Sequence, residues 1–420
     1  MAENEATLYN ARQLNLPEKE ISQAATDIIK RLLDAGYKAY LVGGCIRDLL
    51  LGLHPKDFDI ATDATPEQVK SVFKKKCRII GRRFRLAHIY HNGNIYEVAT
   101  FRGFDQSGDR VVHQGQILRD NIYGSIDQDV LRRDFTCNAL YLDVTDLSII
   151  DYVGGVQDIQ NKRLNLIGKA SDRFTEDPVR MLRCIRFSAK LGLELSEDCR
   201  NTIPKLTNSL LKVPSARLFD EIIKLFHCAK MTAAFQLMRH YKLFDQLFPL
   251  LKKPLAESDH TQEFLSNAFT NTDARLANNQ SVTPVFLMAC VLWPDMIEGY
   301  KKLITKDHKP YEALHIAANK TLEKQRDILS IPRAIQTGIR QIWVMQLRFK
   351  RMHGKGVYTT LHHPRFRAAY DFLLLRASVH EQLELKADFW THIQELSPEA
   401  IRSLIFGKRA RNGKMNAELV

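Results

Sequence analysis

The stretch AYLVGGCIRDLLLGLHPKDFDIAT, residues 39–62, decides how this chain is interpreted. AYLV (39–42) is short and apolar, which predicts a buried strand. Two glycines interrupt it, and CIRDLLLG (45–52) is predicted as a short helix that ends at its glycine. FDIAT (58–62) is predicted as a second strand. The stretch therefore predicts a strand–turn–helix–strand unit with polar groups at the turn and at the second strand.

Two aspartates, Asp57 and Asp59, begin the second strand, with Phe58 between them. On a strand, residues two apart point to the same face, so the two carboxylates converge while Phe58 turns toward the core. Hard oxygen ligands at this spacing suit Mg²⁺, which shares its coordination with waters and substrate phosphates. Such a pair is common, and without further context it is more typical of exposed charges at a strand end.

The glycine pair Gly43-Gly44 lies just upstream, where a strand ends and a helix begins. Such a turn presents backbone N–H groups at a helix N-terminus, which is a site for phosphate. Alone, two glycines are equally typical of a tight turn. Together with the paired aspartates about fifteen residues later, they predict a triphosphate site beside a metal site.

The rest of the chain separates into two parts. A helix is predicted over 17–36, a capped helix begins at Thr65, and Asn92-Gly93 predicts a hairpin turn between two β-rich runs. Residues 1 to about 155 therefore predict a small mixed α/β domain. From about residue 170 onward the apolar pattern is mostly helical.

These motifs resemble one known family. In order along the chain, they are similar to the class II tRNA nucleotidyltransferase and bacterial poly(A) polymerase family, strongly over 38–192 and more weakly near the C-terminus. The family often has glycine or another small residue where this chain has Cys45, a difference that we expect not to affect the chemistry. The matching segments are LVGGCIRDLLLG, KDFDIAT, RRDFTCNALYLD (132–143), DYVGGVQDI (151–159), EDPVRMLRCIRFSAKLG (176–192) and LHHPRFRAAYDFLLLRA (361–377).

The resemblance implies an α/β nucleotidyltransferase head, a small mixed sheet with helices, followed by a mostly α-helical neck, body and tail. We expect the catalytic head in residues 1–155 and a helical neck that recognises the nucleotide base in 156–250. We expect a helical, RNA-binding body in 251–405 and a short, basic, disordered tail in 406–420.

The resemblance also implies two-metal nucleotidyl transfer, in which an RNA 3′-hydroxyl attacks the α-phosphate of a nucleoside triphosphate and pyrophosphate leaves. Asp57 and Asp59 are the expected metal ligands, with Mg²⁺, or Mn²⁺ in its place, as cofactor. Asp134 is the expected third catalytic carboxylate, from the matching motif. Glu97 is the alternative, because a strand acid beside the paired aspartates can face the same metals; an edge-strand salt bridge would explain Glu97 equally well.

Further residues are expected to bind the nucleotide. Asp177 and Arg180 of EDPVR lie at i and i+3, on one face of a helix that Pro178 can begin. An ordinary surface ion pair would fit this spacing, but the resemblance implies that the pair reads the base. Arginine donates and aspartate accepts, which matches adenine and cytosine and rejects uracil and guanine. The triphosphate turn and its neighbours are Gly43, Gly44, Arg47, Arg132 and Arg133.

The same pair cannot separate an enzyme that adds only A from one that adds C and A. IIGRRFRLAH (79–88) and LRDNIYGSIDQDVLRRDFT (118–136) resemble the poly(A) branch, which favours ATP as substrate. Arg82, Arg83 and Arg85 are candidates for primer or phosphate contacts, and solvated charge on a strand would explain them equally well.

A basic and aromatic segment near the C-terminus, RFKRMHGKGVYTTLHHPRFRAAY (348–370), is a second candidate RNA surface. Its expected RNA-binding residues are Arg351, Lys355, Arg365 and Arg367. A solvated helical face is the alternative interpretation. The formal net charge of +13 and the isoelectric point near 9.3 favour a polyanionic partner, although a basic enzyme without one would also have them.

The remaining composition excludes several classes of protein. None of the seven cysteines is spaced as CxxC, so we expect reduced core thiols and no zinc site. No apolar run reaches the length of a membrane span, and the N-terminus lacks the apolar segment of a signal peptide. We therefore expect a cytoplasmic protein without membrane contact, and nothing in the sequence requires more than a monomer.

The sequence thus predicts a template-independent polynucleotide adenylyltransferase that adds AMP from ATP to single-stranded RNA 3′ ends and so marks RNA for decay. A CCA-adding or A-adding tRNA nucleotidyltransferase is the closest alternative. A catalytically inactive RNA-binding protein on the same scaffold is a third, which the intact aspartates oppose.

Overall fold

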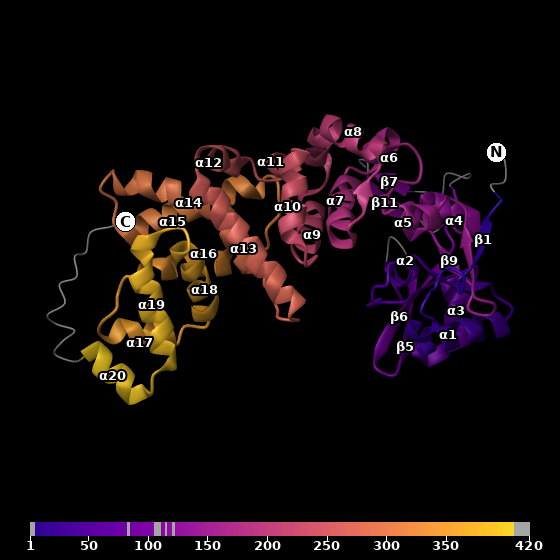
Figure 1. Cartoon of the computed structure of the whole chain (residues 1–420), viewed down its shortest axis with the longest axis horizontal. Coiled ribbons are helices and arrows are strands. Elements are labelled where there is room, and N and C mark those ends of the chain that lie inside the picture. Colours follow the sequence, from indigo (N-terminus) through magenta and orange to yellow (C-terminus); the bar gives the residue numbers. More distant parts are fainter. Residues whose placement is uncertain (1–4, 82–84, 105–110, 114–115, 120–121, 407–420) are drawn as a thin grey trace. The chain divides into compact units, whose positions relative to one another are not determined.

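The structure is a computed structural model that describes residues 5–81, 85–104, 111–113, 116–119 and 122–406 (Figure 1). The chain divides into two compact units. The first contains residues up to 176 together with 191–202, and the second contains 177–190 and everything from 203 onward. No helix of the described part is both long enough and apolar enough to cross a membrane.

The first unit is built on one mixed sheet of eight strands. Its only parallel pair among the described strands is β3 with β6, and every other neighbouring pair is antiparallel. The sheet confirms the predicted α/β head. In spatial order the strands are β1 (Thr7–Asn10), β10 (Ser148–Asp151), β9 (Tyr141–Leu142), β2 (Ala39–Val42), β3 (Asp59–Thr62), β6 (Asn94–Thr100), β5 (Leu86–His91) and β4 (Cys77–Ile80). Two further strand pairs are β7 (Val111–His113) with β8 (Gln116–Arg119) and β11 (Arg163–Leu164) with β12 (Glu194–Leu195).

Two helices, α1 (Gln23–Asp34) and α3 (Pro66–Phe73), pack against the sheet and against each other. Helix α3 has the predicted capping box at Thr65. Helix α1 begins later than the predicted residue 17, because the Ser22 hydroxyl caps it by accepting from the Ala25 amide. The shorter helices of this unit are α2 (Gly44–Leu50), α4 (Ile126–Arg132), α5 (Gly155–Gln160) and α6 (Ala170–Glu176).

The predicted hairpin joins β5 to β6 through Asn92-Gly93. Both residues have positive φ, 48° and 80°, as a two-residue turn that matches the strand twist requires. The turn fixes the register of β5 on β6, with His91 opposite Asn94 and His88 opposite Glu97. Local turn chemistry therefore decides which residues of β6 lie at the end of the sheet that carries the aspartates.

The DYVGGVQDI segment turns the chain from β10 into α5. The buried Asp151 carboxylate accepts hydrogen bonds from four successive backbone amides, those of residues 153–156, at 2.9–3.1 Å. A side chain at Gly155 would meet the Thr136 carbonyl oxygen at 2.3 Å. These two residues hold the turn against the 3₁₀ helix Thr136–Asn138, which follows the RRD segment.

The second unit is helical, as predicted for the C-terminal part. One of its cores is centred on the fully buried Phe349 and Trp390, whose rings meet edge to face at 5.0 Å.

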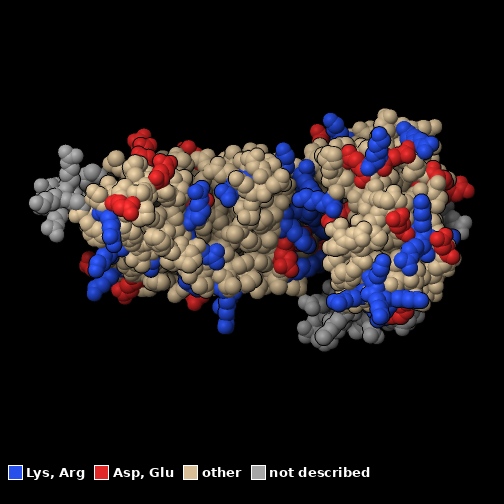
Figure 2. Space-filling view, turned by 90° about the horizontal axis from the view of Figure 1, so that it is seen from below, with Lys and Arg blue, Asp and Glu red and all other residues tan. Residues whose placement is uncertain are grey.

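Lys and Arg side chains are spread over the face drawn in Figure 2, with Asp and Glu among them, so the surplus positive charge does not form one continuous patch there. Helix α8 (Glu197–Leu206) lies mostly in the first unit, which contains residues 191–202. The helices of the second unit are α7 (Val179–Leu191), α9 (Ser215–Phe226), α10 (Met231–His240), α11 (Leu243–Leu247), α12 (Lys252–Glu257), α13 (Asp259–Ala277), α14 (Pro284–Ile304), α15 (Pro310–Arg326), α16 (Arg333–Arg348), α17 (Lys355–Leu361), α18 (Phe366–Ala377), α19 (Glu384–His392) and α20 (Pro398–Phe406).

Candidate active site

The sheet register brings the predicted metal and phosphate groups to one end of the first unit. Val42, the last residue of β2, pairs with Asp59 at the start of β3. On the parallel neighbour β6, Val98 lies opposite Ile60, so Glu97 is next to Asp59. The glycine turn after β2 and three acidic residues therefore lie at the same end of the sheet.

Asp57 departs in detail from the prediction. Strand β3 begins at Asp59, so Asp57 precedes the strand, and Phe58 is half-buried rather than part of the core. Asp57 and Asp59 are both exposed, and the charge on Asp57 still acts on the Asp59 carboxylate. The two acids are therefore close in space, as their spacing predicted.

The Asp59 carboxylate carries negative charge that its surroundings do not balance. Partial loss of hydration, and after it the neighbouring carboxylates of Glu97 and Asp57, raise its pKa to about 6, with Arg133 opposing them. Three mutually repelling carboxylates are the donor set that a divalent cation stabilises, because the cation neutralises them. The residues present therefore fit a magnesium ion.

This acidic group does not amount to a complete coordination sphere. Within the described residues, no three His, Cys, Asp or Glu side chains are arranged as a ready metal site. Mg²⁺ often takes only one or two carboxylates from the protein and fills its remaining positions with waters and substrate phosphates. An incomplete protein shell therefore agrees with a metal that arrives together with a nucleoside triphosphate.

Two residues were candidates for the third carboxylate, and they lie in different surroundings. The exposed Glu97 acts electrostatically on Asp59, and its carboxylate is 3.3 Å from His88 Nε2. Asp134 accepts hydrogen bonds from the Phe135 amide and from Asn138 Nδ2. Glu97 thus belongs to the acidic group around Asp59, whereas Asp134 belongs to the polar network behind the glycine turn. Which of the two completes a metal site stays a prediction.

Gly43 is needed where the turn closes on that network. Its φ of 77° lies in the region that favours glycine, and a side chain here would meet both Arg133 Nη1 and the Asn138 carbonyl oxygen at 3.3 Å. Gly43 is the N-cap of helix α2, which begins at Gly44. The turn is therefore held close to the segment that carries Arg133 and Asp134.

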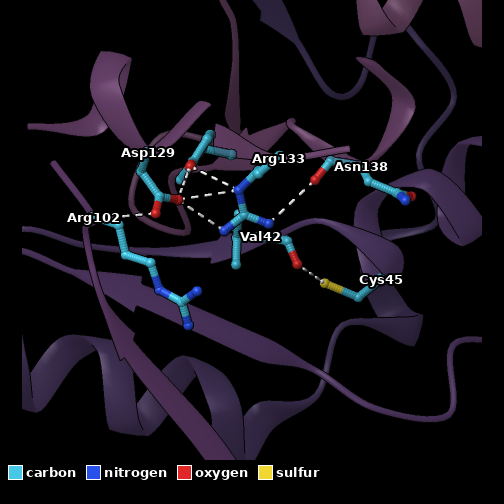
Figure 3. A network of polar contacts seen from close by, with 7 residues as sticks. Val42, Cys45, Arg102, Asp129, Arg133 and Asn138 are labelled. Atoms are coloured by element: carbon cyan, nitrogen blue, oxygen red, sulfur yellow. Dashed lines mark hydrogen bonds and ion pairs between the residues drawn. The ribbon is translucent and has the colours of Figure 1, made fainter. Parts of the chain in front are cut away.

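Arg133 is the centre of a buried polar network (Figure 3). Its guanidinium donates to the Asp129 carboxylate at 3.0 and 3.1 Å, to the Tyr141 hydroxyl at 3.1 Å and to the Asn138 carbonyl at 3.2 Å. Burial disfavours the guanidinium charge, but Tyr141 and Asp129 outweigh it and hold the pKa of Arg133 above its usual value. The Asp129 carboxylate also accepts from the Arg102 amide at 3.1 Å, so the network ties α4 to β9 and to the end of β6.

Two other arginines predicted to bind the nucleotide are also held by protein groups. The buried Arg47 donates to Asp48 through Nε at 2.8 Å and to the Asn138 side-chain oxygen at 2.5 Å. Arg132 donates to the Gly103 carbonyl at 2.5 Å. Asn138, which holds Arg47, and Asp129, which holds Arg133, were not singled out in the sequence, because no motif spacing marks a residue that only supports others.

Cys45 lies against the acidic group. Its thiol donates weakly to the Val42 carbonyl at 3.5 Å, and burial followed by the charge on Asp59 raises its pKa to about 12. The thiol therefore stays protonated and neutral beside Asp59. All seven cysteines are free and buried, as expected for reduced core thiols.

The predicted base-reading residues lie in the second unit, at the start of helix α7. Asp177 accepts from the Val179 amide at 3.3 Å, and Arg217 of α9 donates to its other carboxylate oxygen at 2.7 Å. The Arg180 amide donates to the Asp177 carbonyl at 3.1 Å. Arg217 was missed in the sequence, because it lies 40 residues from Asp177 and in no recognised motif.

The candidate RNA contacts are found in several places. Arg82 and Arg83 lie outside the described residues, and Arg85 forms an ion pair with Glu67 at 2.5 Å. Arg351 and Lys355 are exposed. Arg365 and Arg367 line a cavity of about 460 Å³ in the second unit, together with Arg275, Asp371 and the apolar side chains of Phe286, Leu374 and Leu375.

Comparison with protein families identifies three consecutive segments. Residues 39–165 match the poly A polymerase head domain, and residues 192–254 match a segment described as the probable RNA and SrmB-binding site of polymerase A. Residues 306–417 match the polymerase A arginine-rich C-terminus. The matches begin at the strand–turn–helix stretch and reach almost to the end of the chain.

Individual relatives agree with these matches. Poly(A) polymerase I of Salmonella typhi is 42% identical over 95% of this chain and 88% of its own length. The CCA-adding enzyme of Bacillus pumilus is 38% identical, but over only 56% of this chain and 58% of its own. Among solved structures, a CCA-adding enzyme in its apo form II shares the fold, with a TM-score of 0.65 and 19% identity over 92% of this chain and 87% of that one.

Proposed function

Because this chain belongs to the poly(A) polymerase family of RNA nucleotidyltransferases, we propose that it adds AMP from ATP to RNA 3′ ends without a template. The observation that carries the proposal is how far each likeness extends. The likeness to poly(A) polymerase I runs through the head and the helical unit, whereas the likeness to the CCA-adding enzyme covers little more than half of the chain. The matches of residues 192–254 and 306–417 to polymerase A segments extend the likeness to poly(A) polymerases into the helical part and so support the poly(A) proposal.

In this proposal Asp57 and Asp59 hold the magnesium ions, with Glu97 or Asp134 as the third carboxylate. When bound, the metals would lower the pKa of the attacking RNA 3′-hydroxyl and neutralise charge on the entering and leaving oxygens. The carboxylates would hold the cation at this end of the sheet, and the repulsion that Asp57 and Glu97 exert on Asp59 would be relieved when the cation enters with the triphosphate. The unfavourable repulsion at Asp59 in the free enzyme would thereby favour binding of the cation.

The glycine turn is proposed to hold the triphosphate. The α2 N-terminus at Gly43 and Gly44 offers backbone N–H groups, and the absence of side chains allows phosphate oxygens to approach. Arg47 and Arg133 both contact Asn138 beside the turn, which favours a role in fixing it, and the positive charge of Arg133 acts on Asp59. Arg132 donates instead to the Gly103 carbonyl.

Asp177 and Arg180 are proposed to read adenine, with Arg217 as a residue that positions Asp177. Arg217 engages one carboxylate oxygen, and the Val179 amide engages the other only at 3.3 Å. A carboxylate oriented in this way can accept from the N6 amino group of adenine, while Arg180 can donate to N1.

The helical unit is proposed to bind single-stranded RNA. Arg365 and Arg367 stand beside an apolar cavity whose 460 Å³ volume is in the range of nucleoside-sized ligand sites. Cations beside apolar surface are the combination that holds a phosphate backbone and its bases. We further propose that the protein acts in the cytoplasm and that its tails mark RNA for decay.

A primer-extension assay tests the proposal. An unstructured RNA with a free 3′-hydroxyl and a tRNA lacking its last three nucleotides are each incubated with Mg²⁺ and with single or mixed nucleoside triphosphates. We expect a long ladder on the unstructured RNA with ATP alone.

The alternatives give different products. Extension of the tRNA only, ending after C, C and A, would assign the chain to CCA addition with the same site. A chain that binds RNA and extends neither substrate would be the inactive RNA-binding protein.

A further inference from the structure

A second concentration of unbalanced charge lies inside the helical unit, and it is positive. A cavity of about 120 Å³ opens between α14, the end of α16, α18 and α19. Five basic side chains line it, none of the lining residues is acidic, and two glutamines and a tyrosine provide further polar groups. The basic residues are Lys301, Lys350, Arg376, His380 and Lys386.

Arg376 is the deepest of these cations, and its described partners are neutral. Its guanidinium lies 4.8 Å from the centre of the Trp293 ring, and Nη1 donates to the Gln346 side-chain oxygen at 3.2 Å. The amide nitrogen of Gln346 donates to the carbonyls of Ile342 and Ala369, which fixes its oxygen toward Arg376. The Arg376 Nε atom is buried and has no hydrogen-bond partner among the described residues.

The basic groups repel one another. Burial lowers the pKa of Arg376 to about 10. Burial, and after it the charge of Arg376, lowers the pKa of Lys350 and His380. For Lys386, burial and then the charges of Lys350 and Arg376 act in the same direction. The acids nearest in sequence, Glu381 and Glu384, are exposed and do not line the cavity.

Such an arrangement is costly for a folded protein unless it has a use, because a buried charge is normally paired. The neutral clamp of Gln346 and Trp293 holds Arg376 in place without neutralising it. The cavity is several times the roughly 30 Å³ that one water occupies, and smaller than the roughly 300 Å³ at which pockets for drug-sized ligands begin. It therefore fits a compact oxyanion and not a whole nucleotide.

We propose that this cavity binds a phosphate group, held by the unpartnered Nε of Arg376 and by the ammonium groups of Lys350 and Lys386. Phosphate oxygens can accept from all of these donors, and its charge balances the cluster. The group belongs either to the backbone of an RNA strand or to a free phosphate compound. The proposal is independent of the proposed catalytic function, because the head contributes no residue to the cavity.

The tryptophans allow binding to be measured at this cavity alone. The chain has three, Trp293, Trp343 and Trp390, and all lie in the helical unit. The full-length protein is labelled with 5-fluorotryptophan and titrated with inorganic phosphate while ¹⁹F NMR is recorded; Trp293→Phe identifies the Trp293 signal. We expect that signal to shift saturably with phosphate, and not with sodium chloride at matched ionic strength. An equal shift with chloride, or no saturable shift, would overturn the proposal.

Variants test which groups hold the phosphate. We expect Arg376→Gln to weaken phosphate binding at least about 100-fold and Lys386→Gln about tenfold, as expected for loss of charge-assisted hydrogen bonds. Lys302→Gln is the matched control, because Lys302 lies on α14 beside Lys301 but pairs with Glu298 at 2.6 Å and does not line the cavity. It should change binding less than twofold. If Arg376→Gln does not fold, the test rests on Lys386→Gln, because Lys386 is only half-buried. A Lys386→Gln protein that binds phosphate with the affinity of the unmodified chain would refute the assignment.

A competition experiment distinguishes the two sources of phosphate. A short oligoadenylate is added to the phosphate-loaded, fluorine-labelled protein. Displacement of phosphate, seen at the Trp293 signal, would identify the RNA backbone as the ligand. A Trp293 signal that keeps its phosphate-bound position would identify a free phosphate compound.

Discussion

Two aspartates of the first unit, Asp59 and Asp129, both interact with Arg133 and yet have opposite surroundings. Asp129 is buried, and its carboxylate accepts from Arg133, from the Tyr141 hydroxyl and from a backbone amide. Asp59 is exposed, and two further carboxylates surround it. The same arginine therefore completes a balanced network on one side and only partly offsets a negative cluster on the other.

This difference distinguishes charged residues that stabilise the head from charged residues that are available to bind a ligand. Balanced, buried charge fixes the position of a segment, because removing either partner leaves the other unpaired. Unbalanced, exposed charge weakens the free protein slightly and is retained where a ligand will balance it. The phosphate cavity proposed in the helical unit has the same logic with the opposite sign of charge.

The largest expected effect is on the unbalanced side. Asp57→Ala combined with Asp59→Ala should reduce AMP transfer to RNA by at least about 10³-fold, because the stabilisation that bound metal provides is worth several kcal/mol. RNA binding should persist. Primer extension with ATP measures the first effect, and fluorescence anisotropy of a labelled RNA measures the second.

The control for this pair is Asp34→Asn, an exposed acid at the end of α1 in the same unit. It should leave transfer within about twofold of the unmodified protein, in line with other surface substitutions. A double variant that keeps full activity would remove the basis for calling the Asp57–Asp59 group catalytic.

Substitutions in the buried Asp129–Arg133 network should lower the stability of the head. Asp129→Ala removes the anionic partner of Arg133 and should lower the free energy of unfolding by about 3–5 kcal/mol, the usual cost of breaking a buried ion pair. Urea denaturation followed by circular dichroism measures it. Asp127→Ala, an exposed position on the same helix α4, should cost less than about 1 kcal/mol. Equal losses at the two positions would mean that the network does not stabilise the head.

The comparison also explains what the sequence could reveal. Asp57, Asp59 and the glycine turn were recognisable because their spacing over residues 43–59 has a direct chemical meaning on a strand and a turn. The hairpin at Asn92-Gly93 was predictable for the same reason, since a local turn chemistry determines it.

The rest depends on contacts between distant residues. Asp129 meets Tyr141 through the packing of α4 on the sheet, and Arg217 reaches Asp177 from another helix 40 residues away. The five cations of the cavity are spread over 301–386. No short pattern encodes these pairings, because tertiary packing and not local spacing brings them together.

The Asp177–Arg217 ion pair is intermediate between the buried, balanced Asp129 and the exposed, unbalanced Asp59. Asp177 is half-buried, and the Arg217 side chain is 47% exposed. Arg217→Gln removes one charge-assisted hydrogen bond, so we expect kcat/KM for ATP to fall about tenfold and the preference for ATP over UTP to decrease. Arg333→Gln, an exposed arginine on α16, is the control. A change in RNA affinity with an unaltered nucleotide preference would assign Arg217 to the RNA and not to base reading.

The smallest expected effect is a gain in stability that accompanies a loss of activity. Asp59→Asn should abolish most transfer yet stabilise the protein at pH 7.5, because the asparagine carries no charge for Glu97 and Asp57 to repel. A shift of the Asp59 pKa from 3.8 to about 6 would correspond to about 3 kcal/mol in a buried group, since one pKa unit is about 1.4 kcal/mol. Asp59 is exposed to solvent, so screening reduces the expected gain to about 1 kcal/mol.

The pH dependence gives this prediction its direct test. Between the unfolded pKa near 3.8 and the folded value of about 6, native Asp59 binds more protons than the unfolded chain, so its contribution to stability falls as pH rises through this window. The advantage of Asp59→Asn is therefore complete above about pH 6 and disappears as pH falls toward 3.8. Thermal melts of both proteins without divalent cations should diverge at pH 7.5 and converge near pH 4.5. Added Mg²⁺ should raise the melting temperature of the unmodified protein more than that of Asp59→Asn, because the variant lacks one of the carboxylates proposed to bind the cation; equal Mg²⁺ responses in both proteins would contradict a metal site at Asp59.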